Sequence, residues 1–210
     1  MTNTEHRVTG IPWRVVILIS GRGSNMEAIL RSCRDGVLAG LCEVVLVVSN
    51  HHGAAGLARA GALGTRSAVL DSAGTGREAY CRRLTGLLAA FRPDFVVLAG
   101  FDRVLSEEMV ARYRSRIVNI HPADPVEYRG LHGYRWAFEQ GRPETKVTVH
   151  LVDEGVDTGP VLAQETVSLE GCRTVGEVEA RGLEVEHRLY PEVLARLFTT
   201  AGSEGGPCAV

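Results

Sequence analysis

A polar pair at the end of an apolar run is the first feature of the sequence that could do chemistry. Asn119 and His121 are two residues apart where the run 117–120 ends, so in a β-strand both side chains point the same way. A neutral amide beside a titratable imidazole can bind a carbonyl oxygen and exchange a proton with it. The alternative is a buried histidine satisfied by backbone groups, and the neighbouring Asn119 and Pro122 favour the functional interpretation.

A turn-rich loop supplies acids that could act with this pair. Residues 153–160 contain three carboxylates, those of Asp153, Glu154 and Asp157. A carboxylate that reached His121 would raise the pKa of the imidazole and stabilise its charged form. The alternative is a solvated acidic turn, and periodicity does not decide whether the groups meet.

A glycine-rich loop near the start of the chain is typical of anion binding. The apolar run 13–20 leads directly into Ser20-Gly21-Arg22-Gly23-Ser24-Asn25, and a helical pattern follows. Backbone N–H groups at a helix N-terminus can close on a phosphate, and Ser24 and Asn25 could donate to it. An NAD fingerprint needs a third glycine and an acid after the second strand, where this chain has Ser49-Asn50-His51-His52. The loop therefore favours a phosphate over NAD, and the alternative is a helix cap that binds nothing.

The elements that must position these residues alternate between strands and helices. Continuous β-branched runs, typical of strands buried on both faces, lie at 13–20, 42–49, 95–99 and 117–120, with a weaker one at 66–70. Helical patterns lie between them at 25–34, 56–62 and 77–91, and another helix begins after Ser106 as its N-cap. This alternation predicts a doubly wound α/β fold.

The second half of the chain predicts an extension of that sheet. Strands at 146–151 and 161–167 could pair antiparallel at its edge, and one long helix, bent at Pro191, covers 174–199. Residues 201–210 are Gly-rich and predict a flexible tail. We expect one domain over residues 1–200, with a mostly parallel Rossmann-like sheet, an antiparallel edge extension and a long C-terminal helix.

Composition narrows the class of function. The 210 residues are 45% hydrophobic and 23% charged, which suits one α/β core. A net charge of −2 without a basic block argues against nucleic-acid and membrane-surface partners. Five scattered cysteines without metal-ligand spacing indicate a reducing cytoplasm and no metal site. A polar N-terminus predicts no signal peptide, and no apolar run approaches the ~18 residues of a membrane span. We expect a cytoplasmic monomer or homodimer that acts on small molecules.

A series of motifs then follows in one order from about Trp13 to Phe198. They are ISGRGSN (19–25), TGREAY (75–80), VVLAGFDRVLS (96–106), NIHPA (119–123), GLH (130–132), TVHLVDEGVDTGP (148–160) and EHRLYP (186–191). With these motifs in this order, the chain resembles the glycinamide ribonucleotide formyltransferase family, folate-dependent enzymes of purine synthesis. The resemblance implies transfer of a formyl group from 10-formyltetrahydrofolate to the primary amine of glycinamide ribonucleotide, with no metal.

The resemblance also implies a catalytic trio, Asn119, His121 and Asp157. As an amine attacks the formyl carbon, negative charge develops on the formyl oxygen, and Asn119 and protonated His121 would stabilise it. Asp157 would keep His121 protonated at neutral pH and help to pass a proton from the attacking amine to the leaving nitrogen.

The substrate sites follow from the same resemblance. The acceptor's phosphate would bind at Gly23, Ser24 and Asn25, and its ribonucleotide would be held with the help of Glu186. The folate would bind between the segment after the strand at 95–99 and the acidic loop, and Arg77 would pair with its glutamate tail. The residues of this folate site would be Arg77, Asp102, Arg103, Val104, Leu105, Asn119, Asp153 and Asp157. Val104, Leu105 and Val156 would supply apolar walls, and we expect the side chain of Asp102 to face solvent.

Some residues depart from the family's pattern and leave the acceptor open. Residues 123–130 replace the usual Ser-Leu-Leu-Pro stretch, with Arg129 where proline is typical, and Arg22 and Leu183 also differ. Another amine, such as an amino sugar nucleotide, is therefore a rival acceptor. Methionyl-tRNA is a weaker rival, because its enzymes carry a basic C-terminal domain. A formyl-folate hydrolase would carry an N-terminal regulatory domain. A non-catalytic phosphate- or folate-binding module would be expected to lack one of the catalytic trio.

Overall fold

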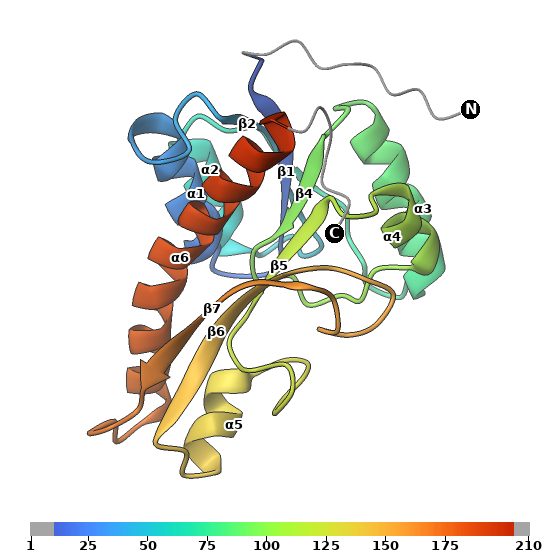
Figure 1. Ribbon diagram of the computed structural model, residues 1–210. Coiled ribbons are helices and arrows are strands. Elements are labelled where there is room, and N and C mark those ends of the chain that lie inside the picture. Colours follow the sequence, from blue (N-terminus) through green and yellow to red (C-terminus); the bar gives the residue numbers. More distant parts are fainter. Residues whose placement is uncertain (1–10, 204–210) are drawn as a thin grey trace.

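One mixed sheet organises residues 11–203, the part of the chain that the computed structural model describes (Figure 1). Its strands are β1 (Trp13–Ile19), β2 (Cys42–Ser49), β3 (Ser67–Val69), β4 (Phe95–Leu98), β5 (Ile117–His121), β6 (Glu144–Leu151) and β7 (Val161–Ser168). They lie in the order β3-β2-β1-β4-β5-β6-β7. The first five strands are parallel, and β6 and β7 pair antiparallel. The predicted fold class, with its antiparallel edge extension, is confirmed.

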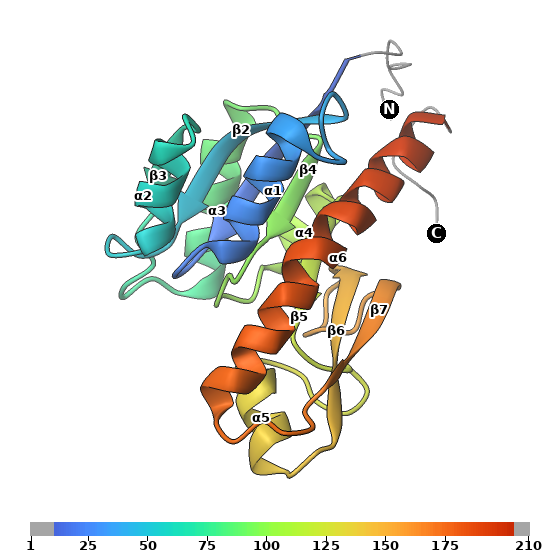
Figure 2. The same cartoon turned by 90° about the vertical axis from the view of Figure 1, so that its left-hand side faces the viewer.

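Helices cover both faces of this sheet, which explains why β1 is apolar throughout. They are α1 (Ser24–Asp35), α2 (Ala55–Ala62), α3 (Arg77–Ala89), α4 (Glu107–Arg112), α5 (Gly133–Glu139) and α6 (Val175–Ser203). Figure 2 shows α1, α2 and α6 on the face toward the viewer, with α3 and α4 behind the sheet. Val15, Ile17 and Ile19 pack in the core beneath α1 and α6, whereas Val16 and Leu18 pack in the core beneath α3 and α4. A strand covered on both faces has no solvent side for polar residues.

The order of the strands places a crevice at the carboxyl ends of β1 and β4. The chain moves outward from β1 to β2 and β3, and then crosses to β4 and β5 on the other side. Ligands of open α/β sheets bind where the order reverses in this way. The loops that follow β1 and β4 reach this edge, as does the end of β5. Antiparallel pairing with β6 then sets Asn119 opposite His150 in register.

The long C-terminal helix is confirmed, and it extends further than the sequence predicted. α6 continues through Pro191 to Ser203, and Figure 2 shows it as one unbroken helix along the sheet. The first three residues of the predicted tail therefore belong to α6, and Ala201 is fully buried against the core. Residues 204–210, the rest of that tail, lie outside the described residues. Burial of Pro191 on the sheet offsets the hydrogen bond that its missing N–H cannot make.

α5 is a helix that the sequence did not predict. It has 7 residues, too few to show a helical repeat of apolar side chains. His132 precedes it with a left-handed φ of 69°. At Gly133 a Cβ would lie 2.5 Å from the carbonyl oxygen of Pro122, so only glycine allows this close approach. The contact sets residues 130–132 beside the end of β5.

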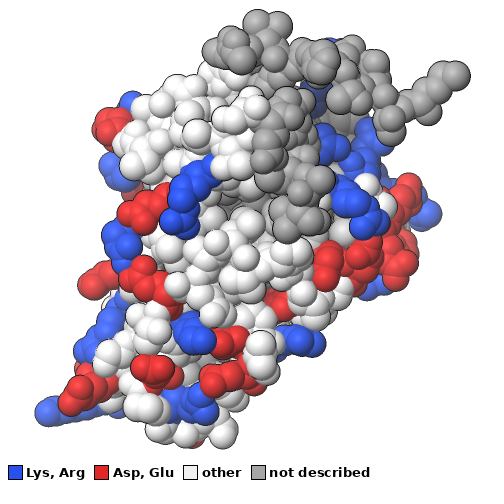
Figure 3. All heavy atoms as spheres, viewed as in Figure 1, with Lys and Arg blue, Asp and Glu red and all other residues white. Residues whose placement is uncertain are grey.

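The face of the molecule seen in Figure 3 carries charges of both signs. On the face seen in Figure 3, lysine and arginine side chains are interspersed with aspartate and glutamate. This pattern differs from the continuous basic surface typical of nucleic-acid-binding proteins. Within residues 11–203, none of the helices is both long and apolar enough to cross a membrane.

Candidate active site

A cavity of about 420 Å³ lies at the carboxyl ends of β4 and β5. One wall is the segment after β4, the opposite wall is the loop between β6 and β7, and residues 130–132 form the rim. Its lining includes every residue of the predicted catalytic trio and most of the predicted folate site, namely Asp102, Arg103, Val104, Leu105, Asn119, His121, Asp153 and Asp157. The motifs are thus brought together from four separate parts of the chain.

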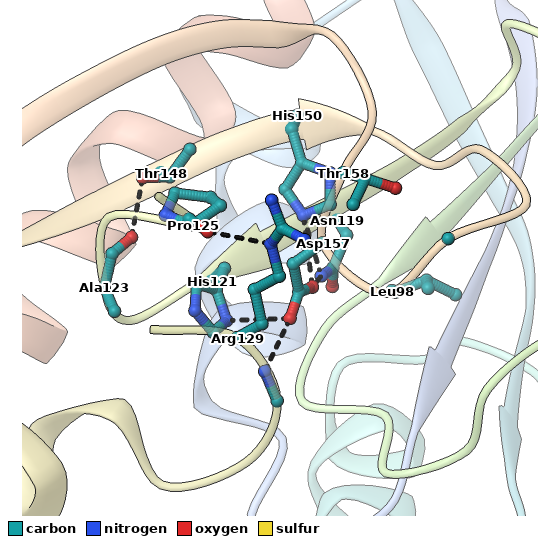
Figure 4. Close-up of polar contacts among 12 residues, drawn as sticks. Leu98, Asn119, His121, Ala123, Pro125, Arg129, Thr148, His150, Asp157 and Thr158 are labelled. Atoms are coloured by element: carbon teal, nitrogen blue, oxygen red, sulfur yellow. Dashed lines mark hydrogen bonds and ion pairs between the residues drawn. The ribbon is translucent and has the colours of Figure 1, made fainter. Parts of the chain in front are cut away.

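Within this cavity, Asp157 joins the two polar side chains of β5 (Figure 4). Its Oδ1 accepts a hydrogen bond from Asn119 Nδ2 at 3.3 Å, and its Oδ2 lies 3.5 Å from His121 Nδ1. The backbone N–H of Gly130 donates to Oδ2 at 2.9 Å. A carboxylate of the acidic loop therefore does reach His121, and Asp157 is the one that does so.

The other acids of the loop have different partners. Asp153 accepts hydrogen bonds from the Gly155 N–H at 3.0 Å and from the Thr158 hydroxyl at 2.6 Å, which closes the turn before Asp157. Glu154 points outward to Arg114. Asp157 itself has a left-handed φ of 52°, a conformation that aspartate and asparagine tolerate better than most residues. The loop is therefore shaped to hold one carboxylate inward.

His150 is a member of the site to which the sequence assigned no role. Its Nε2 lies 3.1 Å from Asn119 Nδ2 and 3.5 Å from Asp157 Oδ1, and its Nδ1 lies 2.8 Å from the carbonyl oxygen of Leu151. Because β6 pairs with β5 in register, His150 lies opposite Asn119. The sequence did contain a signal for this histidine, because it is a polar residue within the largely apolar strand run at 146–151 and within the motif 148–160.

The backbone contacts of the two histidines fix which nitrogen carries a proton. His121 Nε2 lies 2.9 Å from the carbonyl oxygen of Tyr128, and a carbonyl can only accept, so this nitrogen is protonated. By the same reasoning, Nδ1 of His150 is protonated and its Nε2 accepts from Asn119. When His121 is neutral, its Nδ1 therefore carries a free lone pair that faces Asp157. Both amide hydrogens of Asn119 are engaged, one by His150 and one by Asp157.

Burial and the neighbouring carboxylate act in opposite directions on the charge of His121. Burial lowers the pKa of this imidazole below its ordinary 6.5, and it outweighs the nearby Asp157 carboxylate and the Tyr128 carbonyl, which raise it. His121 is therefore neutral at pH 7. Burial raises the pKa of the Asp157 carboxyl, but its polar contacts, among them the hydrogen bond from the Gly130 N–H, hold this pKa below its ordinary value. The site thus holds a neutral imidazole beside an ionised carboxylate.

The wall after β4 is apolar, as predicted, and it is held rigidly. Val104 and Leu105 line the cavity with Val156 opposite them. The guanidinium of Arg103 lies 5.3 Å from the centre of the Tyr80 ring and donates to the carbonyl oxygen of Thr75 at 2.8 Å. Ser106 caps α4, as predicted, by accepting from the Met109 N–H at 3.4 Å. These contacts fix the wall from both ends.

The side chain of Asp102 is 38% exposed, as expected, and it also has three hydrogen-bonding partners that the sequence did not predict. Its Oδ1 accepts from the Ser20 hydroxyl at 2.9 Å and from Asn50 Nδ2 at 2.8 Å, and its Oδ2 lies 2.9 Å from His51 Nε2. The Ser20 oxygen also accepts from the backbone N–H of Asp102 at 2.9 Å. Burial opposes ionisation, but these hydrogen bonds hold the pKa of the Asp102 carboxyl below its ordinary value. The carboxylate links the ends of β1, β2 and β4.

Arg77 lies outside the cavity. It is the first residue of α3, and its Nε pairs with the neighbouring Glu78 at 2.9 Å on the surface. An exposed pair of this kind is worth at most about 1 kcal/mol. The structure therefore places Arg77 apart from the other predicted folate residues.

The predicted phosphate loop lies at the N-terminus of α1, also outside the cavity lining. Gly23 has a φ of 71° and packs so closely on Gly56 that a Cβ would lie 2.7 Å from the Gly56 Cα. The side chain of Asn25 is buried and donates to Glu186, which also accepts from the Tyr134 hydroxyl. One N–H of the Asn25 amide is thus engaged by Glu186, and the backbone N–H groups and the Ser24 hydroxyl are further donors at this loop.

Glu186 is the buried centre of that cluster. Its side chain is only 5% exposed, so in the free protein it supports the phosphate loop through Asn25 and is not open to a ligand. Burial raises the pKa of Glu186 above its ordinary value, although Tyr134 and Asn25 favour the charged form. Arg22 is 69% exposed and pairs weakly with Glu179 at 3.4 Å.

The residues 123–129 that depart from the family's pattern make contacts outside the lining of the cavity. Lys146 pairs with Asp124 at 2.7 Å, and Arg129 Nε donates to the carbonyl oxygen of Pro125 at 2.9 Å. Arg129 lies in the chain between Tyr128, whose carbonyl contacts His121, and Gly130, whose N–H donates to Asp157 (Figure 4). These contacts involve residues 123–130 and leave the contacts among the trio intact.

Comparison with known proteins agrees with this geometry. The family model described as "Formyl transferase" matches residues 13–194. Phosphoribosylglycinamide formyltransferase of Escherichia coli K12 is 40% identical over 182 residues, which cover 86% of this chain and 85% of that protein. The trifunctional purine biosynthetic protein adenosine-3 of Drosophila melanogaster is 43% identical over 185 residues, and the chain spans only 14% of its length.

Solved structures give the same result. The crystal structure of phosphoribosylglycinamide formyltransferase from Bacillus halodurans matches with a TM-score of 0.84 at 40% identity, covering 90% of this chain and 96% of that one. Glycinamide ribonucleotide transformylase 1 from Symbiobacterium toebii matches with a TM-score of 0.86 at 35% identity, covering 95% and 94%. The resemblance that the motifs indicated is confirmed, and the chain belongs to the formyl transferase family.

Proposed function

We propose that this chain transfers the formyl group of 10-formyltetrahydrofolate to the primary amine of glycinamide ribonucleotide, as a step of purine synthesis. The observation that carries the proposal is the contact of Asn119, His121 and Asp157 inside one cavity with apolar walls. The full-length relatives with 40% identity bear this activity in their names. We place the reaction in the cytoplasm, because the cysteines of the described chain are free thiols and not a disulfide framework.

The cavity suits the donor of the formyl group. Its volume of about 420 Å³ lies within the usual range for small-molecule sites. Val104, Leu105 and Val156 offer apolar contact to a flat pterin ring, and the turn backbone at 152–157 offers donors and acceptors to the ring edges. The three polar groups of the trio lie at one end, where the formyl group would react.

Asn119 would stabilise the charge that develops on the formyl oxygen. Its two amide hydrogens are held by His150 and Asp157 in the free protein, so one of these bonds must be exchanged for a bond to substrate. The bond to Asp157, at 3.3 Å, is the longer of the two and the easier to give up. Removing such an oxyanion donor typically costs about 100- to 1000-fold in rate.

His121 would handle the proton. Because the imidazole is neutral with a free Nδ1, it can accept the proton that the attacking amine must lose. The imidazolium so formed would lie 3.5 Å from the Asp157 carboxylate, which stabilises it until the proton passes to the leaving nitrogen. In this order of proton transfers His121 begins neutral, whereas the family resemblance had implied that it begins protonated. Asp157 would then act while His121 is an imidazolium.

The acceptor would bind between the cavity and the N-terminus of α1. Its phosphate would accept hydrogen bonds from the backbone and hydroxyl at Gly23 and Ser24, aided by the helix dipole. Glu186 would hold this loop in place through Asn25. The exposed Arg22 adds positive charge at the entrance.

The test is a formyl-transfer assay with 10-formyltetrahydrofolate and a panel of acceptors. The panel contains glycinamide ribonucleotide, an amino sugar nucleotide, methionyl-tRNA and buffer alone. We expect kcat/KM for glycinamide ribonucleotide to exceed that of every other acceptor by at least about tenfold, which is about 1.4 kcal/mol of selectivity. Faster transfer to the amino sugar nucleotide, or equal release of formate in buffer alone, would show another activity. The Asn119→Ala variant should lose transfer to whichever acceptor is used.

A further inference from the structure

Two cysteine side chains meet at the edge of the sheet opposite the candidate active site. Cys33, in the last turn of α1, and Cys42, the first residue of β2, have their sulfur atoms 3.5 Å apart. Cys42 is buried and Cys33 is half-buried. The loop that joins them contains Gly36 and Gly40, the latter with a left-handed φ of 73°, so the backbone there has freedom to adjust.

A cleft of about 260 Å³ gives access to this pair from outside. Both cysteines line it, together with Leu30, Arg34, Glu43, Val44, Leu63 and Thr65. We propose that Cys33 and Cys42 form a reversible dithiol–disulfide site that reacts with small-molecule disulfides. The site is separate from the formyl-transfer centre, and the proposal does not depend on the acceptor.

The reaction proceeds by two thiol–disulfide exchanges. The Cys33 thiolate attacks one sulfur of a disulfide such as oxidised glutathione, which breaks the S–S bond, releases one glutathione thiolate and leaves a mixed disulfide on Cys33. The Cys42 sulfur then loses its proton to solvent and attacks Cys33, which releases the second glutathione. Two protein thiols are oxidised, one disulfide is reduced to two thiols, and reduced glutathione reverses both steps.

The surroundings assign the two roles. Cys33 is the more exposed of the pair, so an incoming disulfide reaches it first. The two sulfur atoms share a hydrogen bond, and this contact lowers the pKa of the Cys33 thiol below its ordinary value, whereas the same contact and burial raise the pKa of Cys42. Thiolates are the reactive form, so Cys33 attacks and Cys42 resolves.

The position of the Cys33–Cys42 disulfide predicts how it would affect activity and stability. It would fasten the end of α1 to the start of β2, whereas the phosphate loop is at the other end of α1. Oxidation should therefore leave formyl transfer within about twofold of the reduced protein. A disulfide that closes so short a loop should raise the Tm by about 5 °C, because it restricts the unfolded chain.

The experiment equilibrates the full chain with glutathione buffers of increasing oxidation and identifies linked peptides by mass spectrometry. We expect one Cys33–Cys42 peptide, loss of two hydrogens from the intact mass, a higher Tm and full reversal by reduced glutathione. In Cys42→Ala, a mixed glutathione disulfide should instead persist on Cys33. Cys172→Ser, which removes a half-buried free cysteine elsewhere, is the matched control and should behave as the wild type. Absence of the linked peptide, a persistent mixed disulfide in the wild type, or a lower Tm on oxidation would overturn the proposal.

Discussion

Replacement of Asp157 by asparagine tests the role of the carboxylate with little change of shape. Asparagine tolerates the left-handed φ of 52° at this position and can still hydrogen-bond to Asn119 or to the Gly130 N–H. What it removes is the negative charge beside His121. Binding of both substrates should therefore change only a few-fold, while the chemical step slows.

The expected loss follows from the distance between the two groups. When neutral His121 accepts a proton during the reaction, its new charge lies 3.5 Å from the Asp157 carboxylate. At an effective dielectric of about 20, the pair is stabilised by roughly 5 kcal/mol, which corresponds to a factor of about 3000 in rate. Hydrogen bonds that the asparagine retains reduce this figure, so we expect kcat to fall by about 100- to 1000-fold.

The assay is steady-state formyl transfer with both substrates varied in turn, alongside thermal unfolding of each variant. Glu154→Gln is the matched control, because Glu154 is an acid of the same loop that points away to Arg114, and its kcat should be unchanged. The double variant with His121→Ala should be little slower than the slower single variant, since groups that act as a unit are not additive. Independent, multiplicative losses in the double variant would refute the pairing, as would an Asp157→Asn enzyme with near-normal kcat.

Three further perturbations test other parts of the site. Ser24→Ala should raise the KM of the acceptor by about tenfold through loss of a hydrogen bond to its phosphate, and an equal rise in the KM of the folate would mean a structural role. Val104→Asp should raise the KM of the folate by tenfold or more because it sets a charge in an apolar wall, whereas Val126→Asp, at an 89% exposed position outside the cavity, should not. Because burial lowers the pKa of His121 below 6.5, the folded state resists protonation and stability is lost as the pH falls below about 6.5. Denaturant unfolding should show this loss of stability in the wild type and a smaller loss in His121→Gln. In the pH profile of kcat/KM, the decline on the acid side should likewise begin below pH 6.5.

The fold could be predicted from the sequence because its strands are parallel and covered on both faces. Such strands must be continuously apolar, and that requirement makes β1, β2 and β4 visible as β-branched runs. The boundaries were less certain: α3 ends at Ala89 rather than at residue 91, because helix ends depend on local caps. α5 was missed because two helical turns carry too short a pattern.

The contacts within the site were only partly visible. The motifs indicated that Asn119, His121 and Asp157 belong to one site, and they meet in one cavity. His150 was missed because its partner is set by the register of β5 and β6, which no local pattern states. The exposure of Asp102 was predicted, but its three partners were not, because they come from the ends of distant strands. Local periodicity predicts the direction of a side chain along its own strand, and these contacts are made across strands.

The charge of His121 shows how burial can reverse an inference that proximity alone supports. A carboxylate at 3.5 Å favours the imidazolium, and the family resemblance had implied a protonated histidine. The same packing that brings Asp157 to His121 also removes water from the imidazole, and desolvation is the larger effect here. A neutral imidazole can take a proton only at the moment the amine gives one up, and the waiting carboxylate then stabilises the charge that forms. In the proposed mechanism, burial and the ion pair therefore act at different stages: burial would keep the base free before reaction, and Asp157 would lower the energy of the charged state during it.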